Sequence, residues 1–189
     1  MRPLVAVLAG GASSRMGTNK ASVTIGEETL LARVIGVGRS IGDVVVVGGA
    51  PSDEWQRLAD LRSGRLGPLA GLESALVHAA GRDVVLLGVD QPFVRAETLL
   101  RLGEISGDAV VPVDEGWEQV TCAVYREGFL PVVRAALDAG HDLAIHHLLG
   151  RVDTTRVERT EWAAWGEDGR SWYSVDSPEA LATGIKRYG

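Results

Sequence analysis

Short runs of consecutive apolar residues alternate along the first part of the chain with segments whose apolar residues recur every three or four positions. A continuous apolar run is typical of a strand that is buried on both faces, and the wider spacing is typical of a helix with one buried face. The predicted strands are Pro3–Leu8, Val44–Val47, Asp83–Asp90 and Ala109–Val113, and the predicted helices are Thr29–Arg39, Gly67–Ala79 and Ala96–Leu102.

This alternation of strand and helix predicts the fold class. Parallel strands joined by crossover helices form a sheet that is covered on both faces. We therefore expect an α/β protein with a three-layer α/β/α, Rossmann-like architecture and a mainly parallel (mixed) central sheet. The 189 residues fit one domain, spanning 1–189, because no linker, repeat or low-complexity segment interrupts the pattern.

The later part of the chain is less regular, and one earlier segment fits two interpretations. Ser52–Leu61 has helical spacing, but its last four residues, Leu58–Leu61, fit a short strand equally well. Near the C-terminus, Ser177 followed by Pro178 predicts a helix with a serine cap and proline in its first turn. The other expected elements are strands at Gln119–Tyr125, Arg151–Val157 and Trp172–Val175, and helices at Phe129–Ala139 and Leu143–Leu149.

A glycine-rich turn, Ala9–Ser14, follows the first predicted strand and is itself followed by two cations, Arg15 and Lys20. Glycine lets backbone N–H groups approach a polyphosphate closely, and the cations offset its charge. The P-loop pattern is absent, because Arg15 and Met16 stand five residues past Gly10 and Gly11, and the Gly-x-Gly-x-x-Gly dinucleotide pattern is absent, because the glycines are adjacent. The turn predicts a nucleotide triphosphate site, with an ordinary strand-to-helix turn as the alternative.

Two further features fall where predicted strands end or helices begin. Gly67-Pro68 opens a helix, and Asp90 ends a buried strand. An unpaired carboxylate is costly there, but it suits Mg²⁺, which prefers one or two carboxylates together with phosphate oxygens and water. The alternative is that Asp90 caps the turn before Pro92. Because ligands bind beyond the carboxyl ends of parallel strands, we expect Gly10-Gly11, Gly48-Gly49 and Asp90 to share one cleft.

Composition narrows the possible partners. A formal charge of −6 and 5% aromatic residues argue against nucleic acid as a partner. The apolar runs are far shorter than the roughly 20 residues that span a bilayer, and the N-terminal run is too short for a signal peptide. The single cysteine, Cys122, is expected to be a small core residue. Together these features predict a cytoplasmic protein.

Four motifs, spread over essentially the whole chain, carry a resemblance to a known family. The sequence has LAGG followed by RMG and a lysine from Leu8, GPLAGL from Gly67, DQPF from Asp90 and DSPEAL from Asp176. In this order they resemble the MobA-like nucleotidyltransferases, and specifically the molybdenum cofactor guanylyltransferases. The resemblance implies an enzyme that transfers GMP from GTP to molybdopterin and releases pyrophosphate, with Mg²⁺ as cofactor.

The resemblance also implies roles for individual residues. Lys20 would contact the phosphates, Asp60 the GTP and Asp90 the Mg²⁺, and Arg15 would stabilise the departing pyrophosphate. Asp60 is assigned because it stands seven residues before Gly67, and a solvated loop carboxylate is its alternative. The nucleotide would also be contacted by Leu8, Ala9, Gly10, Gly11, Gly67 and Pro68.

The chemistry implied by this resemblance needs no protein nucleophile, because the acceptor phosphate is already anionic and attacks the α-phosphorus in line. Catalysis would then rest on positioning and charge neutralisation. A cytidylyltransferase or sugar-phosphate nucleotidyltransferase, and a non-catalytic nucleotide-binding paralogue, are the alternatives. The chain departs from the family pattern at Asn19, Gly48, Gln119 and Asp176, which bear on the base and the acceptor rather than on the reaction class.

Histidine and tryptophan residues are further candidates for functional roles. His141, His146 and His147 are expected to be ordinary imidazoles rather than metal ligands, because adjacent helical residues point to different sides. The tryptophans could stack on a pterin or form a subunit contact, but packing against the sheet is the expected use; they are Trp117, Trp162, Trp165 and Trp172.

Overall fold

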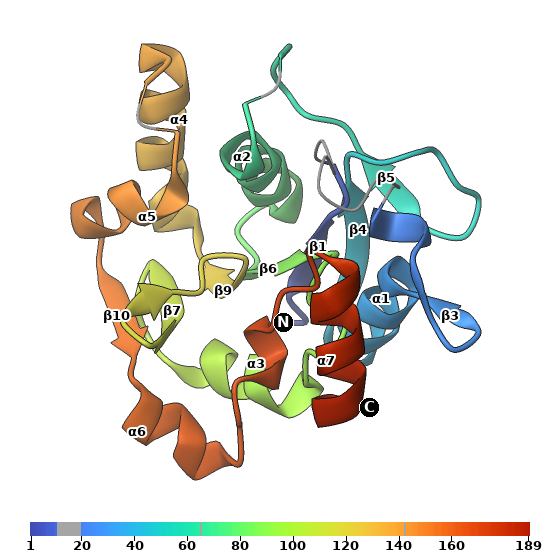
Figure 1. Ribbon diagram of the computed structural model, residues 1–189. Coiled ribbons are helices and arrows are strands. Elements are labelled where there is room, and N and C mark those ends of the chain that lie inside the picture. The colour runs from blue at the N-terminus through green and yellow to red at the C-terminus, as the bar shows by residue number, and fades with distance from the viewer. Residues whose placement is uncertain (11–19, 65, 142) are drawn as a thin grey trace.

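A mixed sheet forms the middle layer of the computed structural model, which describes residues 1–10, 20–64, 66–141 and 143–189 (Figure 1). Its order is β10-β7-β9-β6-β1-β4-β5, with β8 paired to β7. The strands are β1 Leu4–Leu8, β4 Asp43–Val47, β5 Gln56–Leu58, β6 Val84–Gly88, β7 Ala109–Asp114, β8 Trp117–Glu118, β9 Cys122–Tyr125 and β10 Thr154–Val157. A separate hairpin pairs β2 Thr24–Ile25 with β3 Glu28–Thr29 around a turn at Gly26.

The register of the three central strands determines where the site lies. β1 is parallel to β4 and to β6, and Leu8 stands opposite both Val47 and Gly88. Beyond this level the Ala9 amide donates to the Val47 carbonyl (3.0 Å), and the Val89 amide donates to the Leu8 carbonyl (3.1 Å). The loops that follow β1, β4 and β6 therefore leave the sheet side by side.

Helices cover both faces of the sheet, as predicted. One buried cluster contains residues of α2 (Pro68–Ala79), α4 (Leu130–Ala139) and α5 (Ile145–Leu148). The other contains residues of α1 (Leu30–Ile41), α3 (Ala96–Glu104) and α6 (Arg159–Trp162). In Figure 1, α2 and α4 lie above the sheet and α1 and α3 lie below it. Together with the antiparallel strand β9, this arrangement confirms the three-layer fold with a mainly parallel, mixed sheet.

The helix ends show the expected capping chemistry. The Ser177 hydroxyl accepts a hydrogen bond from the Ala180 amide (3.1 Å) at the start of α7 (Pro178–Tyr188), which confirms the predicted cap. The Thr29 hydroxyl accepts from the Ala32 amide (3.1 Å), so Thr29 caps α1 rather than forming its first turn. The chain also forms short 3₁₀ segments at Lys20–Ser22, Glu127–Phe129, Leu149–Arg151, Ala163–Trp165 and Arg170–Trp172.

The prediction of a strand at Trp172–Val175 is wrong. The chain forms a 3₁₀ turn that ends at Trp172, whose buried indole donates from Nε1 to Asp114 Oδ2 (3.0 Å). The Val175 amide donates to the Asp90 carbonyl (2.7 Å) and joins no strand ladder. Aromatic and β-branched residues gave this segment a strand-like pattern, but in the structure they hold it by packing and not by strand pairing.

Other boundaries also differ from the sequence-based expectation. Within the ambiguous segment Ser52–Leu61, Gln56–Leu58 forms the edge strand β5, so the helical interpretation is wrong and the strand ends at Leu58, where the strand alternative had it begin. The predicted helix Leu143–Leu149 shortens to α5 and continues as a 3₁₀ turn. The predicted strand Arg151–Val157 shortens to β10, and α6 follows it directly after Glu158. No helix among the described residues has both the length and the apolar composition needed to cross a membrane.

The aromatic and sulfur-containing candidates occupy mostly structural positions. Trp162 and Trp172 are buried, and Trp165 packs against the same core, as expected, whereas Trp117 is 77% exposed. Cys122 is fully buried on β9, and burial raises the pKa of its thiol well above the ordinary value. A thiol that is buried and protonated is a poor nucleophile, so its expected role as a core residue is confirmed.

Candidate active site

A cavity of about 630 Å³ opens at the carboxyl ends of β1, β4 and β6. Its volume is in the range of pockets that hold a nucleotide-sized ligand. The wall combines strand-end glycines, the start of α2, the loop before α2 and two charged side chains. The residues lining it are Leu8, Ala9, Gly10, Lys20, Val47, Gly48, Asp60, Gly64, Leu66, Gly67, Pro68, Gly71, Gly88, Val89, Asp90 and Thr121.

Two glycines make one part of this wall from bare backbone. Gly48 has a φ of 77°, and a Cβ there would lie 3.0 Å from the Gly10 Cα and 3.1 Å from the Gly10 amide nitrogen. The backbone after β1 and the backbone after β4 therefore contact each other at Gly10 and Gly48. Glycine at both positions permits this close approach of the two backbone segments, and both glycines line the cavity.

The start of α2 forms another part of the wall. Gly67 has a φ of 69° and Pro68 occupies the first helical position, and Gly67, as the N-cap residue, has no side chain that could accept from the first N–H groups of the helix. Gly71 lies on the next turn, where a Cβ would approach Leu8 Cδ2 to 2.7 Å. The helix therefore packs tightly on the end of β1, and its uncapped N–H groups stand at the cavity. An uncapped helix N-terminus favours a negatively charged ligand.

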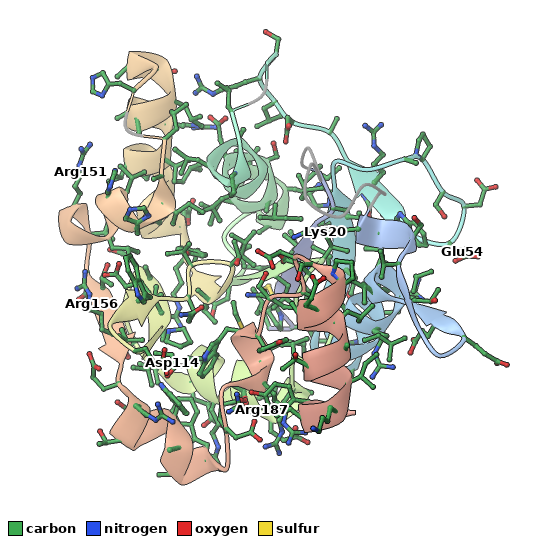
Figure 2. All side chains as sticks on the ribbon, in the orientation of Figure 1. Lys20, Glu54, Asp114, Arg151, Arg156 and Arg187 are labelled. Atoms are coloured by element: carbon green, nitrogen blue, oxygen red, sulfur yellow. The ribbon has the colours of Figure 1, made fainter. Side chains whose placement is uncertain are left out.

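Lys20 and Asp90 meet inside the cavity. Lys20 Nζ lies 3.3 Å from Asp90 Oδ2, and both side chains are partly exposed. Figure 2 shows Lys20 near the centre of the molecule in that view. The cation predicted to bind phosphate and the carboxylate predicted to bind a metal ion therefore lie side by side, although 70 positions separate them in the chain.

The C-terminal segment holds the same carboxylate. The Ser174 hydroxyl donates to Asp90 Oδ2 (2.9 Å), and the Val175 amide donates to the Asp90 carbonyl (2.7 Å). Ser174 was missed in the sequence, because a single serine within an apparent strand carries no signal of its own. Only the downstream DSPEAL motif marked this part of the chain as near the site.

The turn after β6 is built around Gly88, where an added Cβ would overlap Asp90 Oδ1. The Gly88 amide donates to Gln91 Oε1 (2.9 Å), and Gln91 Nε2 donates to Thr121 Oγ1 (3.3 Å). Gln91 is buried, and Thr121 lines the cavity. The first two residues of the DQPF motif therefore have different roles. Asp90 faces the cavity, and Gln91 fixes the turn that orients Asp90.

Replacing Gly88 with alanine is expected to displace the Asp90 carboxylate and to lower turnover by about 10- to 100-fold, because small misplacements of a site group are costly. Steady-state turnover and the melting temperature would be measured together. Gly103→Ala in α3 is the control, since a Cβ there meets nothing within 4 Å. Wild-type turnover in a folded Gly88→Ala protein would contradict the importance of this carboxylate position.

The structure brings most of the predicted site residues together. Among them, Leu8, Ala9, Gly10, Lys20, Asp60, Gly67, Pro68 and Asp90 all line the cavity. Gly11 and Arg15 lie outside the described residues, as does Asn19. Gln119 and Asp176, two positions of departure from the family pattern, do not line the cavity, whereas Gly48 does.

The alternative metal candidates contribute no ligand cluster. Within the described ranges no group of three or more His, Cys, Asp or Glu side chains is arranged to hold a metal ion. His146 and His147 pack edge to face, with ring centroids 4.1 Å apart. Among the described residues, the carboxylates that line the cavity are those of Asp60 and Asp90.

Comparison with known proteins places the chain among nucleotidyltransferases. A family model described as the MobA-like NTP transferase domain matches residues 5–154. A protein from Rhizobium leguminosarum bv. trifolii named molybdenum cofactor guanylyltransferase is 40% identical over 184 residues, which covers 93% of this chain and 88% of that protein.

Solved structures agree with the fold. Molybdopterin-guanine dinucleotide biosynthesis protein A from Archaeoglobus fulgidus superposes with a TM-score of 0.84 at 24% identity and covers 97% of each chain. A 2-C-methyl-D-erythritol 4-phosphate cytidylyltransferase from Thermus thermophilus gives a TM-score of 0.71 at 19% identity, covering 100% of this chain and 99% of that one. Proteins named for different nucleotides therefore share this architecture, and the choice of nucleotide must be argued from the site and from the more similar relatives.

Proposed function

We propose that this chain, which belongs to the MobA-like NTP transferase family, transfers GMP from GTP to the terminal phosphate of a molybdopterin acceptor and releases pyrophosphate. Family membership makes it an enzyme of the nucleotidyltransferase type. The assignment of GTP and molybdopterin follows the relative from Rhizobium, whose sequence matches this chain over nearly its whole length.

The observation that carries the proposed chemistry is the contact between Lys20 and Asp90. An ammonium and a carboxylate 3.3 Å apart in a partly exposed cavity neutralise each other while no ligand is bound. A triphosphate offers the ammonium a more highly charged partner. Lys20 then binds phosphate oxygens, and the Asp90 carboxylate becomes free to bind a cation.

Nucleotidyltransferases typically use a divalent metal, and the residues here fit Mg²⁺. The Asp90 side chain is 29% exposed on the cavity wall, and carboxylate oxygen is the ligand type that this ion prefers. Asp90 would hold the ion, with the remaining positions filled by phosphate oxygens and water. When bound, Mg²⁺ supplies charge neutralisation on the triphosphate. Ser174 keeps the carboxylate aimed by donating to Oδ2.

The protein's own groups then orient the reaction. Backbone N–H groups near Gly10 and at the start of α2 bind the phosphates, and Lys20 offsets the charge that builds up on them. Asp60 lies on the same wall and contacts the nucleoside. The acceptor phosphate is already anionic, so in-line attack on the α-phosphorus requires no general base. Arg15 is assigned to the departing pyrophosphate by its place in the RMG motif.

The whole chain would act as one domain, 1–189. The family model ends at 154, but Ser174 and Val175 complete the environment of Asp90, so the C-terminal residues belong to the same functional unit. The substrates, GTP and a molybdopterin acceptor, favour a cytoplasmic location. Neither the overall charge of −6 nor the cavity suggests nucleic acid as a further partner.

The proposal is tested by pyrophosphate release with molybdopterin, Mg²⁺ and either GTP or CTP. Release with GTP that depends on the acceptor, and at least about tenfold slower release with CTP, is the expected result. A preference for CTP would replace the guanylyl assignment with a cytidylyl one. Binding of GTP without any release would favour a non-catalytic nucleotide-binding protein.

Ligand-induced stabilisation gives an independent expected result. GTP with Mg²⁺ at about 100 times its Kd should stabilise the folded state by about 2.7 kcal/mol, more than CTP, ATP or UTP at the same concentration. The measurement is the melting temperature with each nucleotide, with and without Mg²⁺. Equal shifts for all four nucleotides would argue that the cavity does not select guanine.

A further inference from the structure

The loop that carries Asp60 is joined to two helices by a cluster of charged side chains. Arg62, from this loop, donates from Nε to Glu73 Oε2 (2.8 Å) and from Nη2 to Glu73 Oε1 (2.9 Å). Its remaining terminal nitrogen, Nη1, donates to Asp138 Oδ1 on α4 (2.6 Å). Arg134, also on α4, lies 3.7 Å from Glu73 Oε1. We call the two-pronged Arg62–Glu73 contact the clamp.

A second attachment lies one residue closer to Asp60. The Leu61 amide donates to the Ser74 hydroxyl (3.0 Å), which in turn donates to the Ala70 carbonyl (3.0 Å). Ser74 is fully buried in α2. The described residues of this loop, 59–64, 66 and 67, belong to no strand, and the two contacts attach the loop to α2 directly after Asp60.

The chemistry of the clamp fixes the orientation of Arg62 relative to Glu73. The Glu73 side chain is only 4% exposed, and a buried carboxylate without a partner is costly. Hydrogen bonds from Arg62 to Glu73 and Asp138 raise the pKa of the guanidinium above its ordinary value, so the cation is permanent. A guanidinium fork meets both carboxylate oxygens at once, which fixes the position of Arg62 and not merely its distance.

We propose that Arg62, Glu73 and Ser74 are positioning residues that hold Asp60 in the cavity wall and thereby set the affinity for the nucleotide. The proposal rests on the function assigned above, because it takes the cavity to be the nucleotide site. Asp60, Gly64 and Leu66 from this loop all line the cavity. A loop that is already ordered loses less conformational freedom when the ligand binds, so the clamp lowers the cost of binding.

The test replaces Arg62 with lysine, which keeps the charge but cannot make the fork. We expect the KM for GTP to rise by about tenfold while kcat changes by no more than about twofold, because the clamp affects binding and not the reacting atoms. Arg82→Lys is the matched control. Arg82 is similarly exposed (22% against 26%) and pairs with Asp43 at 2.7 Å, at the opposite end of the strands.

The pattern of the kinetic constants decides the outcome. A merely structural role would shift the melting temperature in Arg62→Lys without a selective rise in KM. Equal KM values in the two arginine variants, or a fall in kcat at unchanged KM, would therefore overturn the proposal. Measuring the melting temperature of both variants keeps a loss of folding apart from a loss of affinity.

A double-mutant cycle tests whether Arg62 acts through Asp60. Asp60→Asn, Arg62→Lys and the double variant are compared for nucleotide affinity. If Arg62 works by placing Asp60, the double variant should bind about as weakly as Asp60→Asn alone, whereas independent residues would give additive losses. Additive losses would overturn the positioning role.

The same experiment separates this inference from the proposed function. Affinities are measured with whichever of GTP, CTP, ATP and UTP the wild-type protein binds most tightly. Tight binding of CTP would reject the guanylyl assignment, while the comparison of Arg62→Lys with Arg82→Lys would still decide the clamp. Failure to bind any of the four nucleotides would count against both.

Discussion

Replacing Lys20 with alanine is expected to lower kcat for nucleotidyl transfer by about 10²- to 10³-fold, with the fold intact. Lys20 Nζ lies in the cavity beside Asp90, where removing a preorganised cation or donor leaves the developing phosphate charge uncompensated. Stability should change little, because the Asp90 carboxylate left behind keeps its hydrogen bond from Ser174 and its access to water. The measurement is kcat for pyrophosphate release, together with the melting temperature.

A second lysine provides the control for this experiment. Lys186 lies exposed on α7, so Lys186→Ala removes the same charge from the protein without touching the cavity. Lys20→Arg should recover only part of the activity, since the guanidinium is larger and has a different hydrogen-bond geometry. Near wild-type kcat in Lys20→Ala would argue against a phosphate cradle at this position.

Asp90→Asn is expected to have an equally large effect, but with a different signature. Charge stabilisation by a bound metal is worth several kcal/mol, and each step of about 1.4 kcal/mol is tenfold, so kcat should fall by about 10²- to 10⁴-fold. Asparagine has nearly the shape of aspartate and can still accept from Ser174, so the turn after β6 should persist. The Mg²⁺ concentration that half-activates the enzyme should rise at the same time.

Asp83 allows a matched comparison at the other end of the same strand. It immediately precedes β6, whereas Asp90 follows it, and it pairs with Arg126, whose Nε lies 3.3 Å from Asp83 Oδ2. Asp83→Asn should leave both kcat and the Mg²⁺ dependence unchanged. If Asp90→Asn lost activity without any change in Mg²⁺ dependence, Asp90 would act on the substrate and not through a metal.

The central part of the fold could be predicted because the sequence patterns of its strands are local. β1, β4 and β6 are continuous apolar runs, and glycines or a carboxylate follow each of them. In a parallel sheet such strand ends must meet at one edge, so the cavity lined by Gly10, Gly48 and Asp90 follows from the pattern.

The remaining details depend on contacts between distant parts of the chain. The antiparallel direction of β9 leaves no mark on its composition, because a strand buried on both faces has the same residues in either direction. Trp172 looked like part of a strand, but its indole is held by Asp114, which lies 58 positions earlier. Likewise, nothing near Arg62 in the sequence indicates that its partner Asp138 lies 76 residues later.

The contact between Ser174 and Asp90 also has a consequence for how the protein is made. The two residues are 84 positions apart, and the contact closes nearly half of the chain into one loop. During synthesis the N-terminal segments emerge first, so β1, β4 and β6 can pair well before Ser174 leaves the ribosome. We therefore expect a growing chain to have its central strands before the Asp90 carboxylate is held in place, and competence for catalysis to be among the last properties that it acquires.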